Sequence, residues 1–182
     1  MIKNYSELRN AIKLEKSIYY PKRKKDRFQA VLLHEHEHAI YKYMKMLRKA
    51  EYFYNNRKNP LFLLGYIIME RRKNLLGQKL GIFIGNNAAA PGLKIFHYGT
   101  VIINADARIA ENCKLHGNNC IGNNGKDNNC PIIGKNVDIG FGAQVIGNVT
   151  IADDVIIGSG AIVVKDCHTK GAVLVGIPAH EV

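Results

Sequence analysis

The 182-residue chain lacks any long apolar run. Its longest, residues 61 to 69, is about nine residues, whereas a helix that crosses a bilayer needs about 20. The first ten residues, MIKNYSELRN, also lack the apolar core of a secretory signal peptide. These absences predict a cytoplasmic protein without a membrane-spanning helix.

Cysteine is sparse and irregularly spaced. The four residues are Cys113, Cys120, Cys130 and Cys167. They form no CxxC pair and no framework of the kind found in small secreted domains. Two of them occupy a small inward position of the repeat described below, where packing explains a thiol without metal or disulfide.

Acidic residues are scarce in one part of the chain only. Residues 1–80 hold 19 Lys and Arg against 7 Asp and Glu, a net charge of +12, while residues 81–182 hold 7 against 8, a net charge of −1. Such asymmetry favours an anionic partner, either lipid headgroups, a phosphate-bearing substrate or nucleic acid, with a solvated basic surface as the plain alternative. The basic part has no recognisable nucleic-acid-reading motif and no aromatic stacking array, so no nucleic-acid partner is expected.

The dominant feature of the second half is a six-residue repeat. From residue 133 an apolar residue returns at every sixth position, and a residue small enough for a narrow stack follows four positions after each. The apolar residues are Ile133, Ile139, Val145, Ile151, Ile157 and Val163, and the second set is Val137, Ala143, Val149, Val155, Ala161 and Cys167. A period of six matches neither an α-helix nor a flat strand. It predicts a β-solenoid, in which hexapeptide units form stacked coils.

The same period continues upstream through Ile103, Ile109, Leu115 and Ile121. Twelve residues separate Ile121 from Ile133, and the polar, glycine-rich segment at 122–131 is predicted to be a loop extruded from the coil. The predicted fold is therefore mainly β, a parallel β-helix over residues 81–182 preceded by an α-helical region over residues 1–80. About four coils of three short strands are expected between residues 97 and 168.

Helical spacing recurs in the N-terminal region. Residues 4–18 form a first pattern, with Ser6 available as its cap, and PKRKKDR at 21–27 is expected to end it. A second, longer helix is predicted from near Asp26 to the aromatic cluster at 52–54. Pro60 opens a third.

The predicted second helix contains HEHEH at 34–38. His34 and His38 would lie one turn apart on one face, a spacing that suits a metal ion. Neither the zincin order nor a third ligand is evident, and alternating charges are common on exposed helices. No metal is therefore expected.

The predicted third helix combines an apolar face with Arg71 and Arg72. Such a face can lie against an anionic membrane surface. It can equally cap the open end of the solenoid, which otherwise exposes a strand edge.

Residues 92–182 resemble the left-handed β-helix acyltransferases. The resemblance is strongest to serine acetyltransferases and to their relatives that O-acetylate capsular and other surface polysaccharides. It rests on HYGTVIINADARIAENCKLH at 97–116, IGFGAQVIGNVTIADDVIIGSGAIVVKD at 139–166 and GIPAHEV at 176–182. It implies a left-handed coil, acetyl-CoA as co-substrate, and a homotrimer with each site in a cleft between neighbouring solenoids.

The resemblance also implies two catalytic histidines. His97 corresponds to the base that takes the proton from an acceptor hydroxyl, and His116 to a second histidine of the cleft. The resemblance implies that the backbone at four positions holds the pantetheine arm of coenzyme A: Gly142, Ala143, Gly160 and Ala161. It also implies that Lys165 is the basic residue near the nucleotide end of coenzyme A. Histidine suits this chemistry because an alcohol is a weak nucleophile at neutral pH and a thioester is already activated.

The plain alternative for His97 is a ring that fills an inward position, six residues before Ile103. A catalytic role requires a local slip of the coil near Gly99. No upstream carboxylate is visible to orient the ring, so a backbone carbonyl or Asp106 is the expected partner.

Four departures from the serine enzymes bear on the substrate. The segment at 81–87 lacks their aspartate, Phe96 replaces another aspartate, Asn129 and Cys130 replace an Arg-His step, and His180 stands where arginine is common. The chain also ends after GIPAHEV, so no cysteine synthase partner is expected.

These departures favour a sugar hydroxyl of a surface polysaccharide or its precursor as the acceptor. Serine O-acetylation is the alternative, and a non-catalytic trimeric scaffold is a more remote one.

Overall fold

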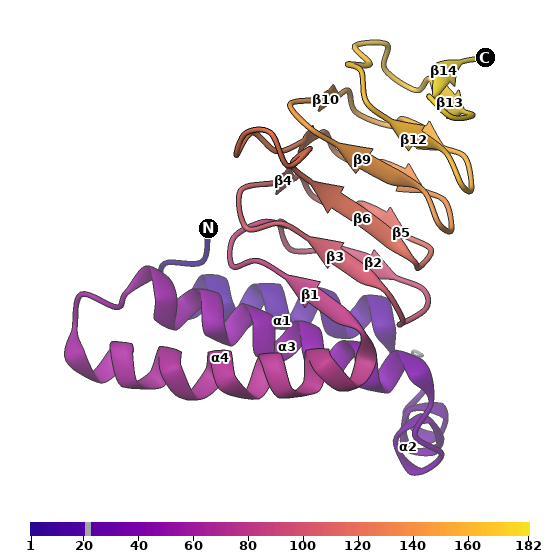
Figure 1. Cartoon of the computed structure of the whole chain (residues 1–182). Helices are drawn as coiled ribbons and strands as arrows, with labels where there is room; N and C mark the ends of the chain where they lie inside the picture. Colours follow the sequence, from indigo (N-terminus) through magenta and orange to yellow (C-terminus); the bar gives the residue numbers. More distant parts are fainter. Residues whose placement is uncertain (21–22) are drawn as a thin grey trace. The chain divides into compact units, whose positions relative to one another are not determined.

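The computed structural model describes residues 1–20 and 23–182, which form two compact units, Met1–Leu80 and Gly81–Val182 (Figure 1). The first unit holds helices only, and the second holds short strands joined by turns. Residues 21 and 22, the start of the segment expected to end the first helix, lie outside the described residues.

The first unit consists of α1 (Tyr5–Tyr19), α2 (Lys24–Leu32), α3 (His36–Asn55) and α4 (Pro60–Leu80). Helix α3 packs against each of the other three. Its buried stripe includes Ile40, Met44 and Leu47, at the spacing of three and four residues that places side chains on one helix face. No helix in the described part of the chain has the length and apolar character needed to span a membrane.

The centre of this unit also contains a buried ionic cluster. The Arg48 guanidinium is 1% exposed, and its Nε lies 2.7 Å from Oε1 of Glu15 on α1. Its Nη1 lies 2.9 Å from Oε2 of Glu51, one turn further along α3. Burial alone lowers the pKa of Arg48, but the two carboxylates raise it overall, so the cation persists inside the helical unit.

Two helix starts can be compared with the prediction. Asn4, not Ser6, caps α1, because its extended backbone lets Oδ1 accept from the Glu7 N–H at 2.9 Å, whereas Ser6 lies inside the first turn. Helix α4 starts at Pro60 as predicted, and Oδ1 of Asn59 accepts from the Leu61 N–H at 2.9 Å.

The prediction of one long second helix was wrong, because the chain breaks between α2 and α3. His34 adopts the left-handed conformation, with φ of 52°. The Glu35 N–H donates to the Ala30 carbonyl at 3.0 Å and the His34 N–H donates to the Val31 carbonyl at 3.4 Å. These two bonds form a Schellman motif, which ends a helix.

The break removes the helical spacing between His34 and His38. His38 lies in α3, where its Nδ1 makes a hydrogen bond with the Tyr20 hydroxyl. Among residues 1–20 and 23–182, no three His, Cys, Asp or Glu side chains gather as a metal site.

The second unit is a parallel β-helix with three sheets. The first sheet contains β1 (Ile82–Ile84), β3 (Val101–Ile103), β6 (Asn119–Gly122), β9 (Gln144–Ile146) and β12 (Ile162–Val163). The second contains β4 (Arg108–Ile109), β7 (Ile132–Ile133) and β10 (Thr150–Ile151). The third contains β2 (Lys94–Ile95), β5 (Lys114–Leu115), β8 (Asp138–Ile139), β11 (Ile156–Ile157), β13 (Val173–Val175) and β14 (His180–Glu181).

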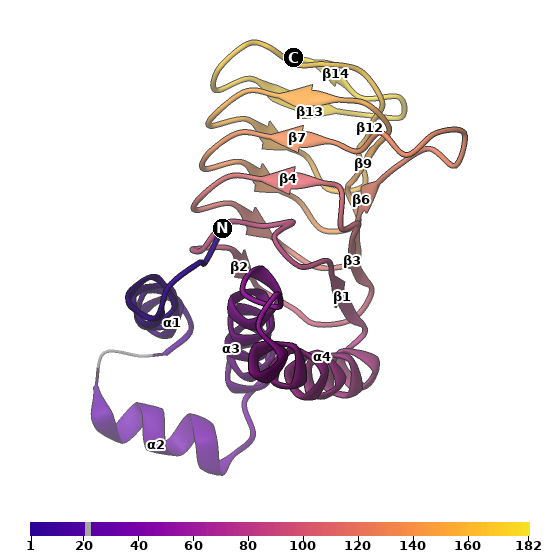
Figure 2. The same cartoon turned by 90° about the vertical axis from the view of Figure 1, so that its left-hand side faces the viewer.

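The six-residue repeat sets the interior of this unit. The predicted apolar positions from residue 133 to 163 are all buried, as are the residues four places after each. Residues 133–165 hold strands and turns without helix, and the segment between β6 and β7 projects from the coil (Figure 2). The predicted solenoid is thus confirmed, and the segment predicted as an extruded loop follows Gly122, the last residue of β6.

The last strand runs against the others. Neighbouring strands pair in parallel up to β13, whereas β14 pairs with β13 in antiparallel register, Val175 opposite His180. Both residues of β14 are exposed.

Candidate active site

The coil slips where the first predicted histidine lies. Ile95 and Ile103 are buried and eight residues apart, whereas Ile103 and Ile109 are six apart. The two additional residues let His97 leave the inward position, and its side chain is exposed. Gly99 has φ of 139°, a value that side-chain-bearing residues rarely adopt. The predicted slip near Gly99 is confirmed.

The structure brings His97 and His116 to adjacent coils. Strand β2 pairs in parallel with β5, and the residues after each strand continue side by side. A β-carbon placed on Gly117 would lie 3.3 Å from the His97 β-carbon. The residue that precedes His97 therefore lies beside His116, and His97 lies beside the glycine that follows His116.

The His116 ring is held by two contacts. The Phe96 ring stacks on it, with 4.6 Å between ring centroids and 24° between ring planes. Its Nε2 lies 2.8 Å from Oδ1 of Asp138 on strand β8, one coil further along. The side chain is still 40% exposed, so a ligand can reach it.

Asp138 bridges two cationic or donor groups. Its second oxygen, Oδ2, lies 3.0 Å from Lys114 Nζ. Burial raises the pKa of the Asp138 carboxyl, but the hydrogen bonds from Lys114 and His116 lower it overall. Asp138 is therefore an ionised acceptor at neutral pH.

Asp106, an expected partner of His97, lies elsewhere on the coil. Its backbone N–H donates to Oδ1 of Asn104 at 3.0 Å. Burial raises the pKa of the Cys130 thiol, and the nearby charge of Asp106 raises it further. Asp106 therefore lies close to Cys130. The carboxylate bonded to a histidine of this site is that of Asp138, and the histidine is His116.

The predicted pantetheine positions form two equivalent corners on adjacent coils. Gly142 and Gly160 both have φ of 73°, and a β-carbon on Gly160 would meet no atom within 4 Å. The side chains of Ala143 and Ala161 are buried. The corners therefore present backbone, not side chains, along an open path.

The backbone amides of these corners are already used. The Gly142 N–H donates to the Gly117 carbonyl and the Gly160 N–H to the Phe141 carbonyl, each at 2.9 Å. The amides of the two following alanines donate within their own turns. Backbone carbonyl oxygens, which have two lone pairs, are thus the groups that fit the amide N–H groups of a pantetheine arm. Lys165, two residues beyond β12, is exposed.

Three residues of this site were missed in the sequence: Phe96 as a stacking partner, Lys114 and Asp138. The signal was available in the coil length. The extruded loop lengthens one coil, so Leu115 pairs with Ile139, 24 residues later. The residues flanking these two positions, His116 and Asp138, are then diagonal neighbours.

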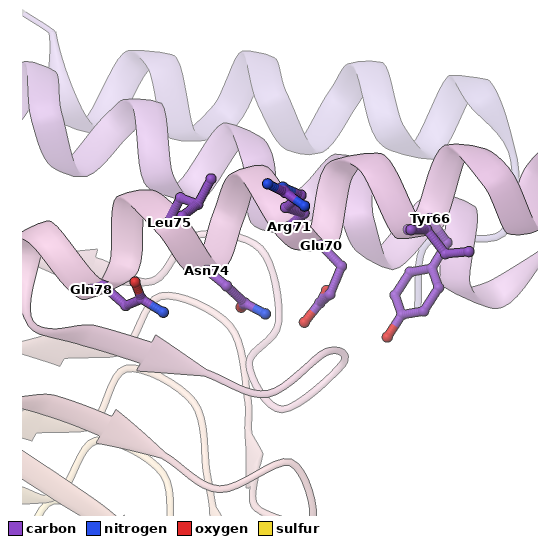
Figure 3. A pocket seen from close by; sticks show the side chains of 7 residues that line it. Tyr66, Glu70, Arg71, Asn74, Leu75 and Gln78 are labelled. Atoms are coloured by element: carbon purple, nitrogen blue, oxygen red, sulfur yellow. The ribbon is translucent and has the colours of Figure 1, made fainter.

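A shallow groove lies elsewhere, along α4 (Figure 3). It is lined by Tyr66, Ile67, Glu70, Arg71, Asn74, Leu75 and Gln78. It contains none of the predicted site residues. The predicted site residues lie instead on the β-helix.

The hexapeptide coil, with His97 and His116 on adjacent turns, matches the left-handed β-helix acyltransferase folds that the sequence resembles. Comparison with curated proteins refines this. The chain is 35% identical over 89 residues to the serine acetyltransferase of Synechococcus elongatus, which covers 48% of this chain and 36% of that protein. It is 32% identical over 129 residues to that of Staphylococcus xylosus, which covers 65% of this chain and 59% of that protein.

Solved structures agree on the fold. The serine acetyltransferase of Neisseria gonorrhoeae has a TM-score of 0.74 at 24% identity, and the match covers 98% of this chain and 68% of that chain. That of Brucella abortus strain S19 in complex with coenzyme A has a TM-score of 0.71 at 22% identity, covering 98% and 68%. No protein-family model matches the chain.

The predicted resemblance to serine acetyltransferase-like left-handed β-helix proteins is therefore confirmed. The chain spans less than two thirds of the length of the curated relatives above, 36% of one and 59% of the other. These relatives are serine acetyltransferases, so the preference for a polysaccharide acceptor has no support among them.

Proposed function

We propose that the protein is an acetyl-CoA-dependent O-acetyltransferase. The observation that carries the proposal is the exposed His97 on one coil and the partly exposed His116 on the adjacent coil of a β-helix whose sequence resembles serine acetyltransferases. A scaffold needs neither an outward slip at His97 nor a histidine bonded to a carboxylate.

In this proposal His97 is the general base. Its imidazole takes the proton of the acceptor hydroxyl while the oxygen forms the new ester bond, and then returns the proton to the departing thiolate. Acetyl-CoA supplies the activated acyl carbonyl. The corners at Gly142 and Gly160 hold the pantetheine arm through backbone carbonyls, and exposed Lys165 lies toward the anionic nucleotide end.

We propose L-serine as the acceptor, in place of the sugar hydroxyl that the sequence departures favoured. The support is the identity of the relatives, which are serine acetyltransferases. Asn129 and Cys130 carry no positive charge with which to bind the serine carboxylate. Another residue must therefore bind it.

The test is release of coenzyme A thiol with L-serine and with a panel of sugars. His97→Ala should lower kcat with L-serine by about 10² to 10⁴, the usual contribution of a positioned general base. His168→Ala, at an exposed histidine on the same β-helix, is the matched control and should retain the rate. An unchanged rate in His97→Ala refutes the mechanism, and a sugar preferred over L-serine refutes the acceptor.

The assembly and the location remain predictions. A homotrimer is expected from the resemblance, and sedimentation of a stable monomer at micromolar concentration would contradict it. Nothing in the comparisons supports a contact of residues 1–80 with anionic membrane. If that contact exists, liposome binding should weaken as salt shortens the Debye length to about 3 Å near 1 M.

A further inference from the structure

The hydrogen bond between His116 and Asp138 fixes which ring nitrogen of His116 carries the proton. The Asp138 carboxylate can only accept, because it is ionised: Lys114 Nζ donates to its Oδ2 at 3.0 Å, and its pKa is lowered. Nε2 of His116 must therefore be the N–H donor. In the neutral ring, Nδ1 is then the nitrogen with the lone pair.

That lone pair has no protein partner. The part of the chain that the structure describes gives His116 one side-chain hydrogen bond, at Nε2, and the stacked Phe96 ring. The side chain is 40% exposed. His116 thus presents a fixed hydrogen-bond acceptor on the coil adjacent to that of His97.

We propose that Asp138 is a positioning residue that sets the tautomer of His116, so that Nδ1 of His116 receives a hydrogen bond from an N–H or O–H group of the acceptor molecule. This inference rests on the proposed function. It gives the two histidines different tasks, because His97 moves the proton of the reacting hydroxyl while His116 recognises a second donor of the same molecule. Asp138 acts through His116 and does not touch the acceptor.

Lys114 makes the proposal sharply testable. Its ammonium group is a donor only, and it occupies one oxygen of Asp138 at 3.0 Å. The amide introduced by Asp138→Asn has a single oxygen, which Lys114 takes, so the NH₂ group faces His116. Nε2 must then accept, which moves the ring proton to Nδ1 and removes the lone pair from the acceptor side.

The companion variant reverses this. In Lys114→Met with Asp138→Asn, no cation competes for the amide oxygen, so the amide can turn its oxygen toward Nε2 and restore the original tautomer. Asp154→Asn is the matched control. Asp154 is bonded by Asn136 at 2.8 Å and by Lys170 at 3.2 Å on the same β-helix, with no histidine involved.

The first measurement is ¹⁵N NMR of the full chain with labelled histidine, assigned with His116→Gln. Wild type and Asp154→Asn should show His116 protonated at Nε2. Asp138→Asn should show it protonated at Nδ1, and the double variant should return to Nε2. A wild-type ring protonated at Nδ1 overturns the inference without any activity measurement.

The second measurement is steady-state kinetics with L-serine. Asp138→Asn should raise KM for the acceptor molecule by about 10-fold or more, because Nδ1 of His116 then presents an N–H donor where the substrate's own donor needs a hydrogen-bond acceptor. kcat should change less than KM, KM for acetyl-CoA should stay unchanged, and the double variant should recover part of the loss. If KM for the acceptor molecule stays the same when the tautomer of His116 changes, the recognition role of His116 is wrong and the proposed function stands. If the wild type releases no coenzyme A thiol with L-serine or with any sugar, the proposed function is wrong together with that role.

Discussion

Replacing Arg48 should damage the helical unit far more than replacing any surface cation. Arg48, Glu15 and Glu51 are 1%, 0% and 2% exposed, and the guanidinium is paired with both carboxylates. Arg48→Met leaves two negative charges buried without their cation. Breaking a buried ion pair from one side costs about 3–5 kcal/mol, and a second orphaned carboxylate places this case at the upper end.

The matched control is Lys45→Met, one turn earlier on α3 at an exposed position. A surface substitution of this kind should change the free energy of unfolding by at most about 0.5 kcal/mol. Replacing the whole cluster, with Arg48→Met, Glu15→Leu and Glu51→Leu, should recover most of the loss, because none of the three charges of the cluster then remains buried.

Urea unfolding followed by far-UV circular dichroism at 222 nm reports on the helices and gives these free energies. If Arg48→Met and Lys45→Met differ by less than about 1 kcal/mol, the charges are not desolvated as the burial implies. If the triple variant is as unstable as the single one, the loss comes from packing of the arginine stem, and the electrostatic reasoning fails.

Three further outcomes follow from local geometry. His34→Gly should stabilise the helical unit by about 1 kcal/mol in the same urea assay, because glycine adopts a φ of 52° without strain; a loss of stability would contradict this. Gly134→Ala should destabilise the β-helix by about 1–3 kcal/mol in thermal unfolding, because its β-carbon would lie 2.7 Å from the Asp153 backbone nitrogen. Lys114→Met should raise the lowered pKa of Asp138, measured by ¹³C NMR. The lowered pKa stabilises the folded protein above the pKa of an unfolded Asp, about 4, and this stabilisation disappears as the pH falls through the pKa of folded Asp138. The variant should therefore have a smaller free energy of unfolding than wild type at pH 7 and the same free energy of unfolding in strong acid.

The fold could be predicted from sequence where a repeat carried it. The six-residue period fixed the inward positions from Ile133 to Val163 and the loop after β6, since a packed coil tolerates few alternatives at its narrow interior. The slip near Gly99 was predicted from the catalytic role that the resemblance implies for His97, because a ring that filled the inward position could not reach a substrate.

Local backbone chemistry was harder to predict. The break at His34 depends on a non-glycine residue in the left-handed region, which composition does not signal. The partner of His116 depends on the register between coils, which the loop length sets. A repeat in the sequence shows which residues point inward, but it does not show which residues of adjacent coils lie next to each other.

The reversed strand at the end of the chain has a consequence for how these molecules meet. A parallel β-helix exposes at its last coil a row of backbone groups that would accept another coil in the same direction, as in a growing fibre. Because β14 lies against β13 in the opposite direction, with His180 and Glu181 outward, that row is already occupied by the chain itself. At this end of the third sheet, the edge offered to a neighbouring molecule is therefore a short, polar, antiparallel strand and not another parallel coil.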